Sequence, residues 1–294
     1  MPDDLLADRA GRRVPRGSPA ATEVVLRSMP RLMALVAAAL LAGGGAAPYP
    51  AAASDDGGRA AAGGELRAVQ AGRWLRLFNG RNLRGWIPKI RGHEPGENFA
   101  RTFRVANGVL QVSYAGYDAF GDRFGYLFYK KPFSHYRLRF EYRFVGAQVA
   151  GGPAFAFRNS GVMLHSQPPR TMTLDQAFPV SLEVQLLGGE DTGERSTANL
   201  CALGIDVVVK GQVNTAPCTP STSKTYRGDA WVGVEVEVRG GKTIRHFVDG
   251  EEVMSYASPQ LDPDSPDVQS LLAKRPHRRE VVTRGWIALR VLRK

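Results

Sequence analysis

The sequence predicts an all-β protein, a jelly-roll β-sandwich made of two antiparallel sheets. Short runs of alternating apolar and polar residues recur from Trp74 onward, and turn residues separate them. No stretch of eleven or more residues has a convincing amphipathic helical period. The 33 glycines and 19 prolines fit a chain with many turns, and a hydrophobic content of 43% is enough for one large packed domain.

The expected strands follow from the alternation. Residues 136–144 (YRLRFEYRF) place aromatic residues and leucine on one face and arginine and glutamate on the other. Residues 181–187 (SLEVQLL) separate Glu183 and Gln185 from three apolar side chains. Further strands are expected within residues 103–113, 231–239, 242–248 and 285–291, with hairpin turns at Asn107-Gly108 and Asp249-Gly250. Residues 267–274 predict one or two helical turns.

The N-terminal region reads as an export signal. Met29 and a basic residue precede a ten-residue apolar run at 32–41, and small residues then lead to Ala51-Ala52-Ala53. The run is too short to span a bilayer, and no Cys ends it, so no stable membrane anchor is expected. We predict that Met29 is the start and that residues 1–53 are an upstream extension plus the signal. A genuine long N-terminal region is the alternative. Residues 54–72 read as a flexible leader, and 73–294 as the domain.

The net charge of +11 raises the question of nucleic-acid binding. Arginine is scattered through the strand-like segments, and the one dense cluster is Lys274, Arg275, Arg278 and Arg279. No basic helical stripe or known nucleic-acid motif accompanies it, so we expect a solvated surface and no nucleic-acid partner.

Two cysteines, Cys201 and Cys218, lie 17 positions apart and are the only two in the sequence. In an exported chain, a lone pair of this kind is expected to form a disulfide that closes one loop. Metal binding is a poorer explanation, because a structural site usually needs four ligands. A disulfide also favours a secreted or periplasmic location.

Several polar residues lie on strands that present one face away from the core. Glu183 and Gln185 suit hydrogen bonds to sugar hydroxyls, or proton transfer where burial raises the carboxyl pKa. Asn159, Ser160 and His165 lie on another strand, and Glu141 lies between two arginines. Without further information, each also fits an ordinary solvated surface.

Several of these segments, in this order, resemble one known family. Residues 77–86 (LFNGRNLRGW) match an opening signature LFNGxxLxGW, and Phe103 with residues 107–110 matches its next hairpin. Residues 159–162 (NSGV) and 182–185 (LEVQ) match two further strands, and Trp231 opens a valine-rich one. The chain thereby resembles the 3-keto-disaccharide hydrolase family over about residues 75–290.

The resemblance implies a concanavalin A-like jelly roll and an enzyme that cleaves 3-keto-glycosides. A C3 ketone acidifies the C2 proton, so a base can start elimination of the glycosidic oxygen, and water then adds. The resemblance makes Glu183, Glu141 and His165 candidates for catalysis, without deciding which is base and which is acid. Asn159, Ser160, Gln185 and Trp86 become candidates for binding a small carbohydrate. A divalent metal could stabilise the enolate, and its identity is unknown.

The chain also departs from the family pattern. Residues 285–289 (GWIAL) keep the start of a late strand, but Arg290 stands where the family has Gln, and the family's last strand is missing. A non-catalytic, lectin-like module is the alternative function, with Trp86, Tyr114, Tyr117 and Tyr126 as sugar platforms. A retaining endoglucanase is less well supported, because residues 183–188 lack its second carboxylate.

Overall fold

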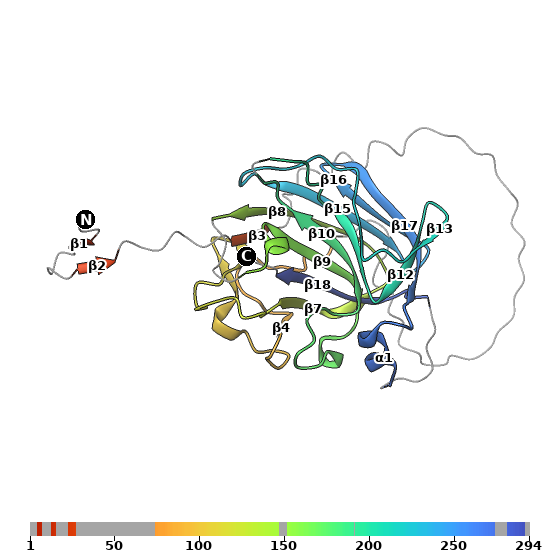
Figure 1. The fold of residues 1–294 in the computed structure, drawn as a ribbon, viewed down its shortest axis with the longest axis horizontal. Helices are drawn as coiled ribbons and strands as arrows, with labels where there is room; N and C mark the ends of the chain where they lie inside the picture. The colour runs from red at the N-terminus through yellow and green to blue at the C-terminus, as the bar shows by residue number, and fades with distance from the viewer. Residues whose placement is uncertain are drawn as a thin grey trace, which may run out of the picture. The chain divides into compact units, whose positions relative to one another are not determined.

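The computed structural model describes residues 5–7, 13–15, 23–27, 74–146, 152–190, 192–273 and 281–291. Most of their regular structure is strand, arranged in one seven-stranded and one nine-stranded antiparallel sheet (Figure 1). This confirms the predicted all-β jelly-roll sandwich. The predicted secretory signal, the predicted leader at 54–72 and the basic cluster at 274–279 lie outside the described residues. Among the helices described, none is long and apolar enough to cross a membrane.

The seven-stranded sheet has β18 in its interior, between β9 and β7 (Figure 1). Its strands are, in spatial order, β14 (Cys218–Thr219), β11 (Asn199–Leu203), β10 (Ser181–Leu187), β9 (Asn159–Ser166), β18 (Gly285–Val291), β7 (Gly125–Phe133) and β4 (Trp86–Ile90). The nine-stranded sheet runs β13 (Gln212–Asn214), β12 (Ile205–Val209), β17 (Glu251–Leu261), β16 (Thr243–Val248), β15 (Val232–Arg239), β8 (His135–Val145), β3 (Glu23–Arg27), β6 (Val109–Val112) and β5 (Phe103–Ala106). The remaining elements are a separate pair, β1 (Leu5–Ala7) with β2 (Arg13–Pro15), the 3-10 turns η2 (Phe99–Arg101), η3 (Ala154–Ala156) and η4 (Pro169–Thr171), and the helix α1 (Pro266–Ala273).

The predicted hairpins form where the turn residues indicate. Asn107 and Gly108 connect β5 to β6 and both have positive φ, 50° and 77°. Asp249 and Gly250 do the same between β16 and β17, with φ of 48° and 92°. Two consecutive residues with positive φ match the twist of an antiparallel hairpin, and Asn, Asp and Gly adopt that conformation at little cost.

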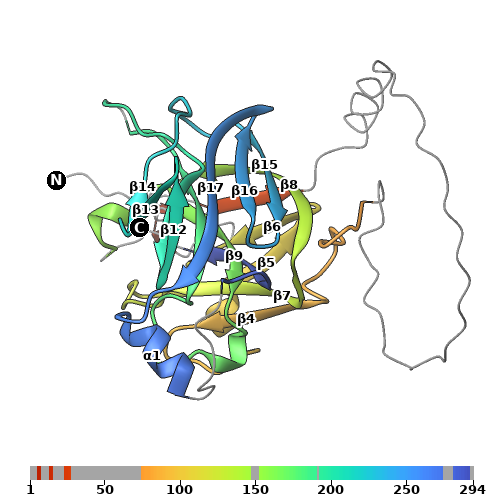
Figure 2. The same ribbon diagram turned by 90° about the vertical axis from the view of Figure 1, so that its right-hand side faces the viewer.

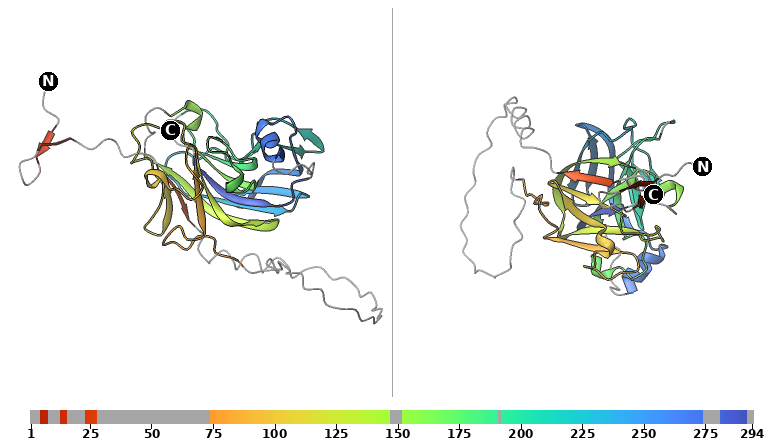
Figure 3. Two further views of the ribbon diagram at one scale, coloured as in Figure 1. Left: turned by 90° about the horizontal axis from the view of Figure 1, so that it is seen from below. Right: turned by 90° about the vertical axis from the view of Figure 1, so that its left-hand side faces the viewer.

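The core lies between the two sheets. Alternate residues of β8 point inward, and among them Tyr142 donates a hydrogen bond to the backbone oxygen of Leu187 in the opposite sheet. Leu182, Val184 and Leu186 of β10 are fully buried on the inner side. Helix α1 packs near the start of β12, where a methyl group on Gly204 would lie 2.9 Å from Val268 (Figure 3).

The predicted disulfide between Cys201 and Cys218 is present. The two residues face each other across β11 and β14, at the edge of the seven-stranded sheet. The bond therefore fastens a two-residue edge strand that few hydrogen bonds could hold alone.

Strand β3 differs from the prediction that residues 1–28 are an upstream extension outside the domain. Its backbone pairs with β8 on one side and with β6 on the other. Figure 2 shows this red strand beside both of them. Residues 23–27 thus form an interior strand of the nine-stranded sheet.

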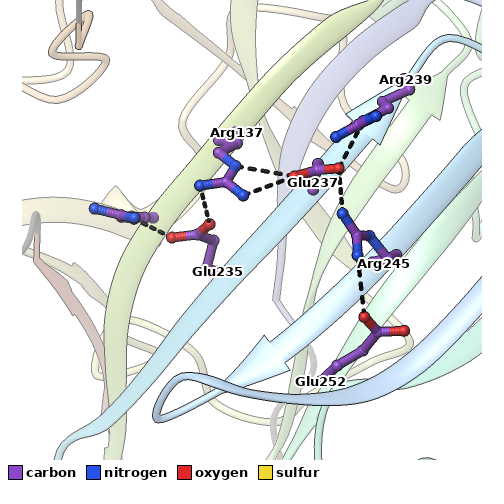
Figure 4. A network of polar contacts seen from close by, with 7 residues as sticks. Arg137, Glu235, Glu237, Arg239, Arg245 and Glu252 are labelled. Carbon is purple, nitrogen blue, oxygen red and sulfur yellow. Dashed lines mark hydrogen bonds and ion pairs between the residues drawn. The ribbon is translucent and has the colours of Figure 1, made fainter. Parts of the chain in front are cut away.

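The outer face of the nine-stranded sheet carries a network of ion pairs (Figure 4). Its centre is Glu237, which accepts hydrogen bonds from Arg137, Arg239 and Arg245. Glu235 pairs with Arg137 and Arg139, and Glu252 with Arg245. Several of the arginines in these strands are therefore paired within the sheet, as expected for a solvated face.

Glu237 provides a test of pH-dependent stability. Its burial would raise the carboxyl pKa, but hydrogen bonds from Arg245 and Arg137 outweigh burial and hold the pKa at about 2. A lowered pKa stabilises the fold at pH values above the unfolded carboxyl's pKa of 4.5, and this contribution is lost as pH falls toward 2. Because the arginines are partly exposed, we expect Glu237→Gln to cost about 1–2 kcal/mol at pH 6.

Urea unfolding of both proteins at pH 6 and pH 2.5 would measure this effect. The difference between wild type and variant should shrink at the lower pH, and Glu252→Gln at the exposed end of the network should cost less. A difference of equal size at both pH values would contradict the assignment.

Candidate functional site

A row of aligned residues crosses six strands of the seven-stranded sheet. The strand pairing places each member opposite the next, so the side chains share one face of the sheet, and the glycine leaves a space on that face. The row, in spatial order, is Asn199, Gln185, Gly161, Arg290, Tyr126 and Lys89. Five of the six can donate hydrogen bonds, which is unusual for the middle of a sheet whose strands are otherwise largely apolar.

Glu183 reaches into the middle of this row. It lies two residues from Gln185 on β10, and both of its carboxylate oxygens accept hydrogen bonds from the same guanidinium nitrogen of Arg290. Glu183 is completely buried, and the Arg290 side chain is 6% exposed. Burial raises the pKa of the Glu183 carboxyl, and the Arg290 charge and hydrogen bonds oppose that rise. The Nε of Arg290 is buried without a hydrogen-bond partner among the described residues.

Gly161 makes room for the Glu183 carboxylate. A Cβ at position 161 would lie 2.7 Å from the Cγ and Cδ atoms of Glu183, closer than real Cβ contacts occur. Only glycine therefore allows Glu183 to lie flat over β9 and reach Arg290 on β18. The glycine of the NSG segment is explained by this close approach.

Gly161→Ala tests the role of this space. The added methyl group must displace Glu183 from Arg290, so we expect loss of folding stability of about 1–3 kcal/mol and loss of any activity that depends on the pair. Gly125→Ala in β7 is the matched control, because its methyl group would meet neighbours at ordinary distances of 3.4 Å or more. Thermal unfolding of both variants measures the effect. If the two variants unfolded at the same temperature, the space at Gly161 would not be needed to hold Glu183 against Arg290.

The connection between β9 and β10 covers the other end of the row. Lys89 Nζ donates to the backbone oxygen of Leu174 at 2.9 Å, and the Tyr126 hydroxyl donates to that of Ala177 at 2.9 Å. The Phe178 ring centre lies 5.1 Å from the Arg290 guanidinium carbon, which is a cation–π contact. Residues 174–178, which we call the covering segment, thus lie over Arg290.

The opposite end of the row is the more accessible one. Asn199 donates to the Gln185 side-chain oxygen at 3.2 Å, and its own oxygen accepts from the Ser221 backbone at 2.9 Å. Gln185 is the one member of β10 that is not buried. A ligand approaching from solvent would therefore meet Gln185 before Glu183.

Asn159 belongs to the same face, as the sequence suggested. It lies two residues before Gly161 and is 4% exposed. Its amide nitrogen donates to the Phe155 backbone oxygen at 2.9 Å, while its side-chain oxygen is buried without a partner among the described residues. The structure therefore brings Asn159, Glu183 and Gln185 to one face of adjacent strands.

Ser160 and Trp86, two other predicted binding residues, lie elsewhere. The Ser160 hydroxyl donates to the Arg290 backbone oxygen at 2.7 Å and so helps to hold β18 against β9. Trp86 shares the inner face of β4 with Ile90, and its indole nitrogen donates to the Leu77 backbone oxygen at 3.1 Å. Both side chains make structural contacts away from the Glu183 carboxylate.

The structure separates the other two predicted catalytic residues from Glu183. Glu141 lies on β8 with the outward-facing arginines of the nine-stranded sheet, whereas Tyr142 beside it points into the core. His165 has a positive φ of 50°, which breaks the alternation of β9 at a point where the pairing with β18 also shifts. Its ring contacts the Gly240 backbone oxygen of the other sheet at 3.0 Å. The alternation of side chains predicted that His165 shares the face of Asn159, and this irregularity in the strand makes that prediction wrong.

The residues around Glu183 do not suit a divalent metal ion. No group of three or more His, Cys, Asp or Glu side chains occurs among the described residues. The Arg290 guanidinium occupies the place beside Glu183 where a metal cation would bind. The neighbouring oxygen atoms that could act as metal ligands belong to the neutral amides of Gln185 and Asn199. The metal raised by the resemblance stays a prediction.

Arg290, Lys89, Tyr126 and Asn199 were not identified as residues of one site. In the sequence, Arg290 stands out only because the family has Gln at that position. The signal that could have found it is its polar position inside an apolar run, GWIALRV, aligned with Gly161 once β9 and β18 are paired. Gly161 and Arg290 are 290 − 161 = 129 positions apart, so their pairing is not visible in the sequence.

A comparison with known protein families finds one match. The model of the 3-keto-alpha-glucoside-1,2-lyase-like domain matches residues 73–290. The chain belongs to this family. The match includes every strand of the seven-stranded sheet except the last residue of β18, and therefore all residues of the row. No curated protein matches this member of the 3-keto-alpha-glucoside-1,2-lyase-like family significantly.

Proposed function

We propose that this protein cleaves the glycosidic bond of 3-keto-glycosides, with Glu183 as the base. The buried pair of Glu183 and Arg290, in a chain of this family, is the observation that carries the proposal. A carboxylate shielded from water beside a fixed cation suits removal of a proton next to a ketone, since negative charge then develops on a nearby oxygen. Among the predicted catalytic residues, Glu183 alone lies on this face.

The reaction would begin when the Glu183 carboxylate removes the proton at C2 of the sugar. The C2–H electron pair moves toward C3 and places negative charge on the ketone oxygen. When this electron pair moves back, a double bond forms between C1 and C2 and the bond between C1 and the glycosidic oxygen breaks. The leaving oxygen takes a proton, which protonated Glu183 can return. The products are an unsaturated 3-keto sugar and an alcohol, and addition of water to the double bond would complete hydrolysis.

Arg290 would serve this reaction in two ways. Its contact with both oxygens of Glu183 favours the ionised carboxylate, which is the form that accepts a proton. Its Nε–H has no partner among the described residues and can donate to an oxygen that gains negative charge. No step in this scheme is assigned to a metal.

Access to Glu183 requires movement of the groups packed around it. Glu183 is fully buried, and the covering segment places Phe178 over Arg290. A sugar entering from the Gln185 side would have to displace part of this cover, and the polar row would then offer amide and guanidinium donors to its hydroxyls.

The lectin-like alternative receives less support. Of its four aromatic platforms, Tyr114 and Tyr126 are 1% exposed, and Trp86 and Tyr117 are half-buried and packed against the core. Sugar-binding modules need exposed rings, whereas this face offers a buried carboxylate and guanidinium. The two functions make opposite predictions for turnover.

We also propose that the protein acts outside the cytoplasm, in the periplasm or as a secreted protein. The disulfide between Cys201 and Cys218 supports this location, because reducing compartments rarely maintain structural disulfides.

Incubation of the purified protein with a 3-keto-glucoside and with the same glucoside unoxidised tests the proposed function. We expect release of the alcohol from the 3-keto-glucoside only, and an equal rate in the presence of a chelator. Binding without release of the alcohol would favour the lectin-like function. Loss of activity in the presence of a chelator would show that the reaction needs a metal ion.

A further inference from the structure

Among the described strands, β3 alone joins the β5–β6 hairpin, residues 103–112, to the rest of its sheet. The strand order at this end of the sheet is β8, β3, β6, β5, so neither strand of the hairpin pairs with β8 directly. Residues 23–27 face residues 141–145 of β8 over five positions, and residues 24–26 face residues 110–112 of β6 over three. A five-residue segment therefore connects two parts of the domain.

The two strands beside β3 are buried where they meet it. Leu110 and Val112 of β6 and Tyr142 and Phe144 of β8 are each less than 5% exposed. Without β3, the backbone groups of both strands would lose hydrogen-bond partners inside a sheet, and these side chains would lie beside a gap. The position between β6 and β8 is thus a slot that requires an extended segment.

The occupant of the slot comes from outside the matched family domain. The family match begins at residue 73, and β3 ends at residue 27. The segment Glu23-Val24-Val25-Leu26-Arg27 suits a strand, because β-branched residues favour the extended backbone. Both strands that border the slot lie within the matched residues, whereas residues 23–27 lie outside them.

We propose that the slot between β6 and β8 is a strand-acceptor site and that residues 23–27 of this chain are its occupant. The recognition is main-chain pairing on both sides of an added strand. This role does not depend on the proposed enzymatic activity. It requires that residues 23–27 stay with the folded domain, so it excludes both a start at Met29 and removal of a signal by a cut after Ala53.

A full-length protein with a protease site inserted between Gly57 and Gly58 tests the proposal. After cleavage, we expect the N-terminal fragment to co-elute with the domain on native size exclusion and to separate from it in denaturant. The variant Val25→Pro should release the fragment, because proline cannot donate to the ladder, and should lower the melting temperature of the uncut chain by about 6–12 °C. Ala21→Pro, outside the strand, is the matched control and should do neither.

Hydrogen exchange on the unmodified full chain gives a second test that needs no variant. The amides of residues 24–26 should exchange at least 100-fold more slowly than in an unstructured peptide. Fast exchange there, or release of the fragment after cleavage with an unchanged melting temperature, would overturn the proposal.

Discussion

Glu183→Gln is expected to reduce cleavage of a 3-keto-glucoside by at least about 100-fold, the usual contribution of a general base. The substitution keeps the size of the side chain and a hydrogen-bond acceptor for Arg290 but removes the group that accepts the C2 proton. Steady-state kinetics with wild type and variant measure the effect, and kcat should fall while KM changes little. The same assay across pH should show wild-type activity rising with pH through a pKa above that of an ordinary glutamate, because burial raises it.

Glu141→Gln is the matched control for this experiment. It makes the same chemical change on the outer face of the other sheet, so activity should stay within about twofold of wild type. If Glu183→Gln retained full activity, or if Glu141→Gln lost it, the assignment of the base would be wrong.

Arg290→Gln should have the largest effect on stability. Removal of the guanidinium leaves the Glu183 carboxylate buried without a counter-ion, which typically costs about 3–5 kcal/mol. The pKa of Glu183 should rise further, since burial remains and the opposing charge is gone. A carboxyl whose pKa is raised in the folded state costs no stability while the unfolded carboxyl is protonated too, and the cost grows as pH rises from the unfolded pKa of 4.5 to the raised pKa. The loss should therefore be small at low pH and grow as pH rises toward that pKa.

Chemical unfolding at several pH values measures this loss, and a double-mutant cycle isolates its cause. The double variant Glu183→Gln/Arg290→Gln should be more stable than Arg290→Gln alone at neutral pH, because it carries no buried charge. Arg170→Gln, at an exposed position, should change stability by less than about 0.5 kcal/mol. If the double variant lost the sum of the two single losses, Glu183 and Arg290 would not be coupled.

The sequence was sufficient for most of the strands because one face of each is buried. The predicted segment 181–187 coincides with β10, and 285–291 with β18. Hairpins at Asn107-Gly108 and Asp249-Gly250 were predictable because turn chemistry is local. Strand β3 was not predictable, since a five-residue run gains its partners only from strands more than 80 positions away.

The site was only partly predictable. Alternation placed Glu183 and Gln185 on one face, and it also placed Glu141 on a polar face, but it could not show that the two faces belong to different sheets. His165 failed because a positive φ interrupts the period of two. Arg290 could be recognised as a partner of Glu183 only after β9, β10 and β18 were aligned, because Gly161 leaves the space through which the two side chains meet.

Exchange at C2 of the sugar is the most direct test of the central claim that Glu183 starts the reaction by removing a proton there. A 3-keto-glucoside deuterated at C2 should react with wild-type protein more slowly than the protonated substrate, and NMR should show loss of the C2 deuterium in the products. Glu183→Gln should show neither cleavage nor deuterium loss. Cleavage by the wild-type protein with full retention of deuterium at C2 would contradict the account.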